Sequence, residues 1–134
     1  MIFLVIDDSS TQRKLIIQSL QEIGFTHVEE AANGLEGYNK IKETPIDFVL
    51  TDWNMPVLDG LEFMVLIKGQ EKFKHIPIIM ISTQGKTDDV LTAVRLKVNN
   101  YIIKPFTSET LQLKIREVLN ALNKKPVDYL LESE

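Results

Sequence analysis

Short apolar runs alternate along this chain with longer segments in which apolar residues recur every three or four positions. The short runs are rich in Ile, Val and Phe, so they predict β-strands. Runs 2–6, 47–51 and 77–81 are almost continuously apolar, which is typical of strands covered on both faces. The run at 27–31 includes His and two Glu residues and predicts an edge strand, and residues 100–103 supply the fifth strand.

The longer segments predict amphipathic helices, several of which begin with a capping residue. Ser9 or Ser10 is suited to cap the first helix, because a hydroxyl can accept from the free N–H groups of the first turn. Asn33 and Asp59 are each followed three residues later by Glu, which is the spacing of a capping box. The predicted helices cover residues 10–23, 34–43, a segment that follows Asp59, 87–98 and 108–122.

Five strand–helix units in sequence predict an α/β fold with a doubly wound parallel sheet, right-handed crossovers and helices on both faces. The chain has 134 residues, which suits a single domain. Pro126 should stop the last helix from continuing, because proline cannot donate the helical hydrogen bond. We therefore expect a domain over residues 1–122 and a short tail over residues 123–134.

Composition and charge narrow the class of protein. The chain is 44% hydrophobic and 25% charged, as in ordinary globular proteins, and its net charge of -4 argues against broad nucleic-acid binding. The absence of cysteine excludes disulfides and thiolate metal sites and allows a reducing compartment. The first apolar run is too short for a secretion signal or a membrane span. We expect a cytoplasmic protein without membrane insertion.

Three acidic residues follow two of the buried strands. Asp7 and Asp8 end the run at 2–6, and Asp52 ends the run at 47–51. Ligands of open α/β sheets bind at the carboxyl ends of the parallel strands, so these side chains should lie close together. Converging carboxylates repel each other unless a cation offsets their charge, and Mg²⁺ prefers such oxygen ligands. The positions predict a magnesium site with a reactive aspartate, although a turn and helix cap would also explain Asp7 or Asp8.

Lys104 and Ser82 are expected at the same edge of the sheet. Lys104 follows the strand at 100–103 and precedes Pro105, which favours extended geometry at the lysine, and Ser82 follows the strand at 77–81. A solvated surface lysine and an ordinary loop serine remain open alternatives. With the carboxylates, these groups suit phosphoryl transfer to an aspartate, because that reaction needs mainly positioning and charge neutralisation. The sequence lacks a Gly-x-Ser-x-Gly motif, which argues against a serine hydrolase.

The order of these motifs resembles the receiver domain of two-component response regulators, and specifically the stand-alone CheY-like regulators. The resemblance covers residues 1–122 and implies a flavodoxin-like (βα)5 fold with strand order 2-1-3-4-5. Because several separate motifs match, the signal is stronger than any one of them. They are Val5-Ile6-Asp7-Asp8-Ser9, Thr51-Asp52-Trp53-Asn54-Met55-Pro56, Asp59-Gly60, Pro77-Ile78-Ile79-Met80-Ile81-Ser82 and Tyr101-Ile102-Ile103-Lys104-Pro105-Phe106.

The resemblance also implies roles at the acceptor site. Asp52 would accept a phosphoryl group from a phosphohistidine on a kinase, and the protein would be a switch rather than an enzyme acting on other substrates. Asp8 would bind Mg²⁺ directly, with Mn²⁺ as a possible substitute, and Asp7 would bind mainly through water. The carboxylate of Asp52 and the main-chain carbonyl of Asn54 would complete the protein ligands.

Other residues resemble the parts of the family that bind and sense the phosphoryl group. Lys104 would pair with that group, Ser82 would be the switch hydroxyl, and Tyr101 would be the aromatic residue that turns inward when the hydroxyl moves. Thr83 and Asn54 would contact the phosphoryl group or line the path of the attacking water. Because Thr83 replaces the smaller alanine that the family often has, we expect slower phosphate loss than in Thr83→Ala.

Lys97 departs from the family pattern. It stands near the end of the fourth predicted helix, where the family commonly has glycine. Glycine permits a positive φ at such a position, and lysine adopts it less easily. We expect Asn99 or Asn100 to take over the turn, because asparagine tolerates the left-handed region.

The resemblance implies protein partners. A sensor histidine kinase similar to CheA would donate the phosphoryl group, a flagellar motor switch protein would read it in chemotaxis, and a phosphatase could remove it. One alternative is a phosphorelay intermediary that passes phosphate to a histidine phosphotransfer protein, and a less favoured one is a magnesium-dependent aspartyl phosphatase. We expect a monomer whose partner face includes Val90, Val94, Tyr101, Ile103 and Lys114.

Overall fold

The computed structural model describes residues 1–83 and 85–123 and contains one parallel sheet with the strand order β2-β1-β3-β4-β5. This confirms the parallel sheet that the sequence predicts and the strand order that the family resemblance implies. Asn123 belongs to the last helix, and the rest of the expected tail, residues 124–134, lies outside the described residues. In chain order the elements are β1 (Phe3–Ile6), α1 (Ser10–Glu22), β2 (Val28–Ala31), α2 (Gly34–Glu43), β3 (Phe48–Thr51), α3 (Gly60–Lys68), β4 (Ile78–Ser82), α4 (Thr87–Arg95), β5 (Asn100–Ile103) and α5 (Ser108–Asn123).

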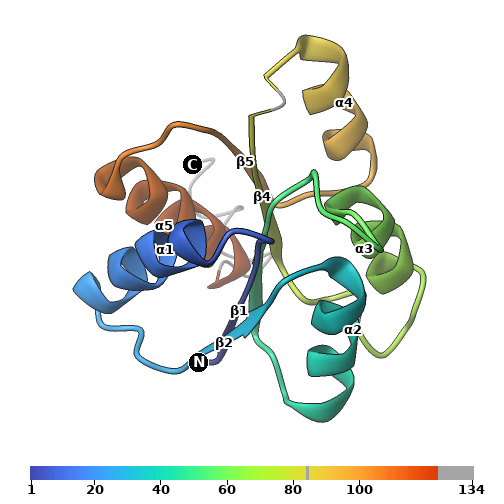
Figure 1. Cartoon of the computed structure of the whole chain (residues 1–134), viewed down its shortest axis with the longest axis horizontal. Coiled ribbons are helices and arrows are strands. Elements are labelled where there is room, and N and C mark those ends of the chain that lie inside the picture. Colours follow the sequence, from blue (N-terminus) through green and yellow to red (C-terminus); the bar gives the residue numbers. More distant parts are fainter. Residues whose placement is uncertain (84, 124–134) are drawn as a thin grey trace, which may run out of the picture.

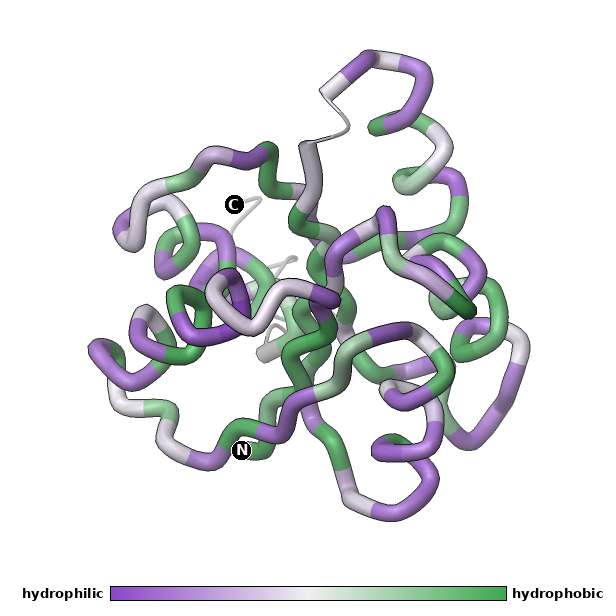
Figure 2. Tube along the Cα trace, in the orientation of Figure 1, coloured by the Kyte–Doolittle hydropathy of each residue, from purple (hydrophilic) through white to green (hydrophobic). Residues whose placement is uncertain are grey.

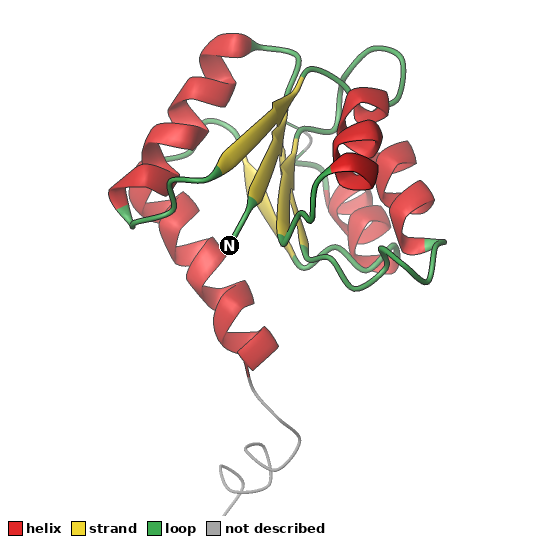
Figure 3. Ribbon diagram, turned by 90° about the horizontal axis from the view of Figure 1, so that it is seen from below, coloured by secondary structure: helices red, strands yellow, loops and turns green. Residues whose placement is uncertain are grey.

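The helices form two layers, one on each face of the sheet. Helices α1 and α5 cover one face, and α2, α3 and α4 lie on the other (Figure 1). Seen after a quarter turn, the strands stand between the two layers (Figure 3). Within the described residues, no helix is both long and apolar enough to cross a membrane.

The core follows from the apolar runs. Every residue of β1, β3 and β4 is buried, whereas β2 is mixed and lies at an edge, as predicted. Hydrophobic residues are concentrated along these central strands, and hydrophilic ones on the outer helices (Figure 2). Because side chains alternate along a strand, Leu4 and Ile6 join one core cluster while Phe3 and Val5 join the other.

Capping bonds fix where several helices begin. Ser9, rather than Ser10, caps α1 by accepting from a backbone N–H of the first turn. Asp59 and Glu62 form both bonds of a capping box at α3. Asn33 accepts from the backbone N–H of Glu36 at α2, but the Glu36 carboxylate accepts from the Asn33 side-chain amide instead of its backbone. The three helix starts for which the sequence predicts a cap are therefore confirmed, two with the expected residue and one with the first of two candidate serines.

The end of α4 differs from the prediction. The helix stops at Arg95 instead of continuing to residue 98, and Lys97 itself adopts the left-handed conformation with φ 67°. The N–H of Lys97 donates to the carbonyl of Val94, and the next residue donates to Ala93, which is the Schellman pattern. Our expectation that Asn99 or Asn100 makes this turn is wrong. Asn99 is instead bound to β4. Its backbone N–H donates to the carbonyl of Ile78, and its side-chain oxygen accepts from the backbone N–H of Ile78.

Candidate metal centre and active site

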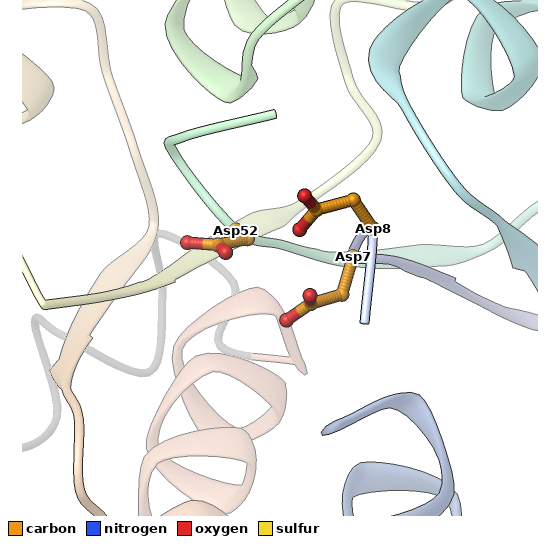
Figure 4. A group of neighbouring side chains, drawn as sticks. All are labelled: Asp7, Asp8 and Asp52. Atoms are coloured by element: carbon orange, nitrogen blue, oxygen red, sulfur yellow. The ribbon is translucent and has the colours of Figure 1, made fainter. Parts of the chain in front are cut away.

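The three acidic residues meet at the carboxyl edge of the sheet. Ile6 and Thr51 are partners in the ladder between β1 and β3, so the residues that follow them, Asp7 and Asp52, leave the sheet side by side. The backbone N–H of Asp52 also donates to the carbonyl of Ile6 at 2.9 Å. One carboxylate oxygen from each of Asp7, Asp8 and Asp52 lies within 4.8 Å of the other two. The three side chains can be followed in Figure 4.

Lys104 joins this cluster from the end of β5. Its Nζ donates to a carboxylate oxygen of Asp7 at 2.9 Å and of Asp52 at 3.3 Å. The side chains of Lys104, Asp7 and Asp52 are only 13%, 2% and 12% exposed, so their charges interact with little screening by water. The alternative of a freely solvated Lys104 is therefore wrong, and the predicted grouping of the lysine with the carboxylates is correct.

Burial and nearby charges shift the pKa values of Asp52 and Lys104. Desolvation, reinforced by the charge of Asp7, raises the pKa of Asp52 above its ordinary value, although Lys104 opposes the shift. Burial alone would lower the pKa of Lys104, but its hydrogen bond with Asp7 and the two nearby carboxylates raise it. The lysine therefore stays positively charged and offsets part of the repulsion between the carboxylates.

The donor set of the acidic cluster fits a hard divalent cation. Three carboxylates supply oxygen ligands, and Mg²⁺ in proteins usually binds one or two carboxylates and keeps several waters. Both carboxylate oxygens of Asp7 already accept hydrogen bonds, one from the Ser9 N–H at 2.9 Å and one from Lys104. Asp8 is exposed, so its side chain is accessible from solvent. This difference agrees with direct ligation by Asp8 and an indirect role for Asp7.

Ser82 and Tyr101 are coupled beside the cluster. Ser82 is the last residue of β4 and is fully buried, and its carbonyl accepts from the N–H of Lys104 at 2.8 Å. The side chains of Ser82 and Tyr101 share a hydrogen bond. Thr83 follows as an exposed residue, and Asn54 is exposed in the loop after Asp52. The predicted switch pair is therefore in contact, while Thr83 and Asn54 stand where solvent can reach them.

The predicted partner face is partly exposed and partly packed. Val94 and Ile103 are 56% and 50% exposed, whereas Val90 and Lys114 are half-buried. Sequence reasoning missed Leu91, which is 45% exposed on α4. These residues come from α4, β5 and α5, the elements at one edge of the sheet.

A cavity of about 510 Å³ opens beside the acidic cluster rather than over it. It is formed by α1 and by the loops that follow β4 and β5, and its wall includes Thr83, Lys104 and Phe106. The cavity shares Lys104 with the cluster, but it is lined by none of the three aspartates. Charge and strand topology therefore locate this centre better than cavity size does.

Two residues that support the site were not predicted from the sequence to be functional. Gly60 is needed because a Cβ there would clash with the main-chain carbonyl of Asp52. Arg13, on α1, donates through Nη1 to the main-chain carbonyl of Asp7 at 2.6 Å and through Nε to Glu30 at 2.9 Å. The Asp59-Gly60 motif signals the glycine, but the local sequence around Arg13 gives no comparable signal.

Comparisons with known proteins agree with this geometry. The family model described as response regulator receiver domain matches residues 3–116. The chain is 38% identical over 119 residues to chemotaxis protein CheY-3 of Vibrio cholerae, covering 89% of this chain and 92% of that protein. It is 45% identical over 117 residues to chemotaxis protein CheY1 of Helicobacter pylori, covering 87% and 94%. The solved structure of the chemotaxis response regulator CheY4 of Vibrio cholerae matches with a TM-score of 0.81 at 32% identity, covering 87% and 97% of the two chains.

Proposed function

The chain belongs to the response regulator receiver family, and on this premise we propose that it is a signalling switch that is phosphorylated on Asp52. One observation carries the choice of residue. The Asp52 carboxylate lies 3.3 Å from Lys104 Nζ and adjoins the carboxylates of Asp7 and Asp8. A phosphoryl group at this position would have cationic partners on both sides once a metal ion is bound.

The chemistry needs few groups. A carboxylate oxygen of Asp52 attacks the phosphorus of a phosphohistidine, an O–P bond forms, and the electron pair of the broken N–P bond returns to the imidazole. Mg²⁺, held by Asp8, Asp52 and the carbonyl of Asn54, would supply positive charge to the phosphoryl oxygens. Lys104 would offset part of the remaining negative charge. The protein catalyses only its own phosphorylation and dephosphorylation in this proposal, so it is not an enzyme acting on other substrates.

The switch would act through Ser82. A phosphoryl group adds about two negative charges and three acceptor oxygens, so it competes with Tyr101 for the Ser82 hydroxyl. Movement of Ser82 toward the phosphoryl group would free space for Tyr101 to turn further inward. A change from 1:99 to 99:1 between two states requires about 5.5 kcal/mol of differential stabilisation. The new charge and its hydrogen bonds would have to supply that difference.

The relatives support a choice of partners. The two sequence relatives, CheY-3 and CheY1, are chemotaxis proteins, which supports a CheA-like histidine kinase as donor and a flagellar motor switch protein as reader. The reader would bind the face that includes Val94, Ile103 and Lys114, and a phosphatase would reset the switch. We place the protein in the cytoplasm as a monomer. Transfer assays with histidine phosphotransfer domains separate a role in motor control from that of a phosphorelay intermediary.

Trp53 provides the test, because it is the only tryptophan and its backbone N–H donates to the Asp52 carboxylate at 2.7 Å. Its fluorescence should change on addition of Mg²⁺ and change again with acetyl phosphate. Asp52→Asn should lose the response to acetyl phosphate. A response that persists in Asp52→Asn, or the absence of any Mg²⁺ response in the parent protein, would contradict the proposal.

A further inference from the structure

Arg13 connects three elements at the edge of the acidic cluster. It lies on α1, its Nη1 donates to the main-chain carbonyl of Asp7 after β1, and its Nε donates to Glu30 on β2. The Arg13 side chain is only 17% exposed, and the Glu30 side chain is 49% exposed. A guanidinium has several donors in a fixed planar arrangement, so one arginine can bind both acceptors at once.

The hydrogen bond from Arg13 adds to the contacts that hold Asp7 in place. The backbone N–H of Asp7 donates to Ala31, its carbonyl accepts from Arg13, and its carboxylate accepts from Ser9 and Lys104. The peptide between residues 7 and 8 is planar, so fixing the carbonyl of Asp7 also fixes the direction in which the chain enters Asp8. Arg13 therefore helps to set the position of the backbone that carries the exposed Asp8 carboxylate.

The hydrogen bond with Glu30 determines where the charged guanidinium of Arg13 lies. Arginine pairs strongly with carboxylates, and in the proposed site Asp8 binds the metal directly while Asp7 acts mainly through water. An Arg13 released from Glu30 could turn to these carboxylates and compete with the cation. With Glu30 bound to Nε, the guanidinium instead contacts the cluster through the backbone carbonyl of Asp7.

We propose that Arg13 is a positioning residue for the metal centre, and that Glu30 holds its guanidinium on the backbone and away from the ligand carboxylates. The inference rests on the proposed function, because it assigns a role toward the Mg²⁺ of that site. Partners of this kind that orient metal ligands commonly change metal affinity by about 10–100-fold when they are removed.

The sign of the effect separates positioning from simple electrostatics. Removal of a positive charge near a cation site should strengthen Mg²⁺ binding if only charge matters. Removal of a positioning contact should weaken it. Lys14 is the matched control, since it is an exposed cation on the same helix, one residue away.

The experiment titrates Mg²⁺ into the full-length chain and follows Trp53 fluorescence in Arg13→Met, Arg13→Lys, Glu30→Gln and Lys14→Met, with melting curves to verify folding. We expect the dissociation constant to rise about tenfold in Arg13→Met and less in Arg13→Lys. It should not rise in Lys14→Met. The phosphorylation rate with acetyl phosphate should recover in Arg13→Met at saturating Mg²⁺, because positioning acts on affinity for the metal.

Glu30→Gln tests the second half of the proposal. It should weaken Mg²⁺ binding in the parent background but have no further effect in Arg13→Met. An unchanged or tighter affinity in Arg13→Met overturns the role of Arg13. If that variant does not fold, an affinity equal to the parent's in both Arg13→Lys and Glu30→Gln overturns it instead. A parent protein that does not bind Mg²⁺ overturns the proposed function as well, so the two failures are distinguishable.

Discussion

Thr83 is an exposed side chain directly after the buried Ser82, and it lines a cavity together with Lys104. If Asp52 is phosphorylated as proposed, the methyl and hydroxyl groups of Thr83 would restrict the path of the attacking water. We expect Thr83→Ala to shorten the phosphorylated lifetime by roughly two- to tenfold, which corresponds to at most about 1.4 kcal/mol in the barrier.

The decay of the phosphorylated state, followed by Trp53 fluorescence after removal of the donor, measures this lifetime. Thr83→Val is the matched control, because it keeps the bulk of threonine and removes only the hydroxyl. Equal decay rates for the parent and Thr83→Ala would show that the size of this side chain does not limit hydrolysis.

Tyr101 has a hydroxyl that should ionise only at unusually high pH. Burial raises its pKa above the ordinary value, although the hydrogen bond with Ser82 lowers it. Because the pKa of the folded state lies above that of the unfolded state, this tyrosine stabilises the fold below about pH 10, and that contribution is lost as the pH rises through the folded-state value.

The alkaline absorbance change of tyrosine tests this expectation. The titration of the parent should contain a late component that disappears in Tyr101→Phe and remains in Tyr38→Phe. The stability of Tyr101→Phe should also fall less steeply above about pH 10 than that of the parent. A late component that survives in Tyr101→Phe would contradict the placement of this hydroxyl.

The ends of the elements show where sequence patterns stop being informative. The strands are predicted to within a residue at each end, and for β1, β3 and β4 the reason is that continuous apolar runs indicate burial on both faces. The end of α4 was missed because the apolar periodicity continues through Leu96 and Val98, which pack against the core beyond the helix. Asn99 is bound to β4 through its backbone and its side chain, so the chain turns earlier, at Lys97.

The C-terminal turn of α4 carries a prediction of its own. Lys97 has φ 67°, where a Cβ is unfavourable by roughly 1–2 kcal/mol and glycine is not. We expect Lys97→Gly to raise the free energy of unfolding by about 1 kcal/mol, because glycine adopts this conformation without the steric penalty. Urea denaturation measures the change, and Lys97→Ala serves as control because it keeps the Cβ. A glycine variant that is no more stable than the alanine variant would contradict this account of the turn.

The molecule as a whole shows which parts of the site a sequence can predict. Asp7, Asp8, Asp52 and Lys104 were found because each stands at a strand end, and parallel topology brings strand ends together. Arg13 was not found, because its contacts depend on how α1 lies against the turn after β1 and on the edge strand β2. Periodicity places a residue on a helix face, but it does not give the rotamer that reaches a particular carbonyl.

Chemical trapping tests most directly the proposal that Asp52 is the phosphoryl acceptor. Borohydride reduces an aspartyl phosphate to homoserine, so treatment with Mg²⁺ and acetyl phosphate followed by reduction marks the acceptor. Mass spectrometry of the resulting peptides should locate homoserine at position 52, and the mark should be absent in Asp52→Asn and in the parent without Mg²⁺. Homoserine at position 7 or 8, or none under any condition, would contradict the account.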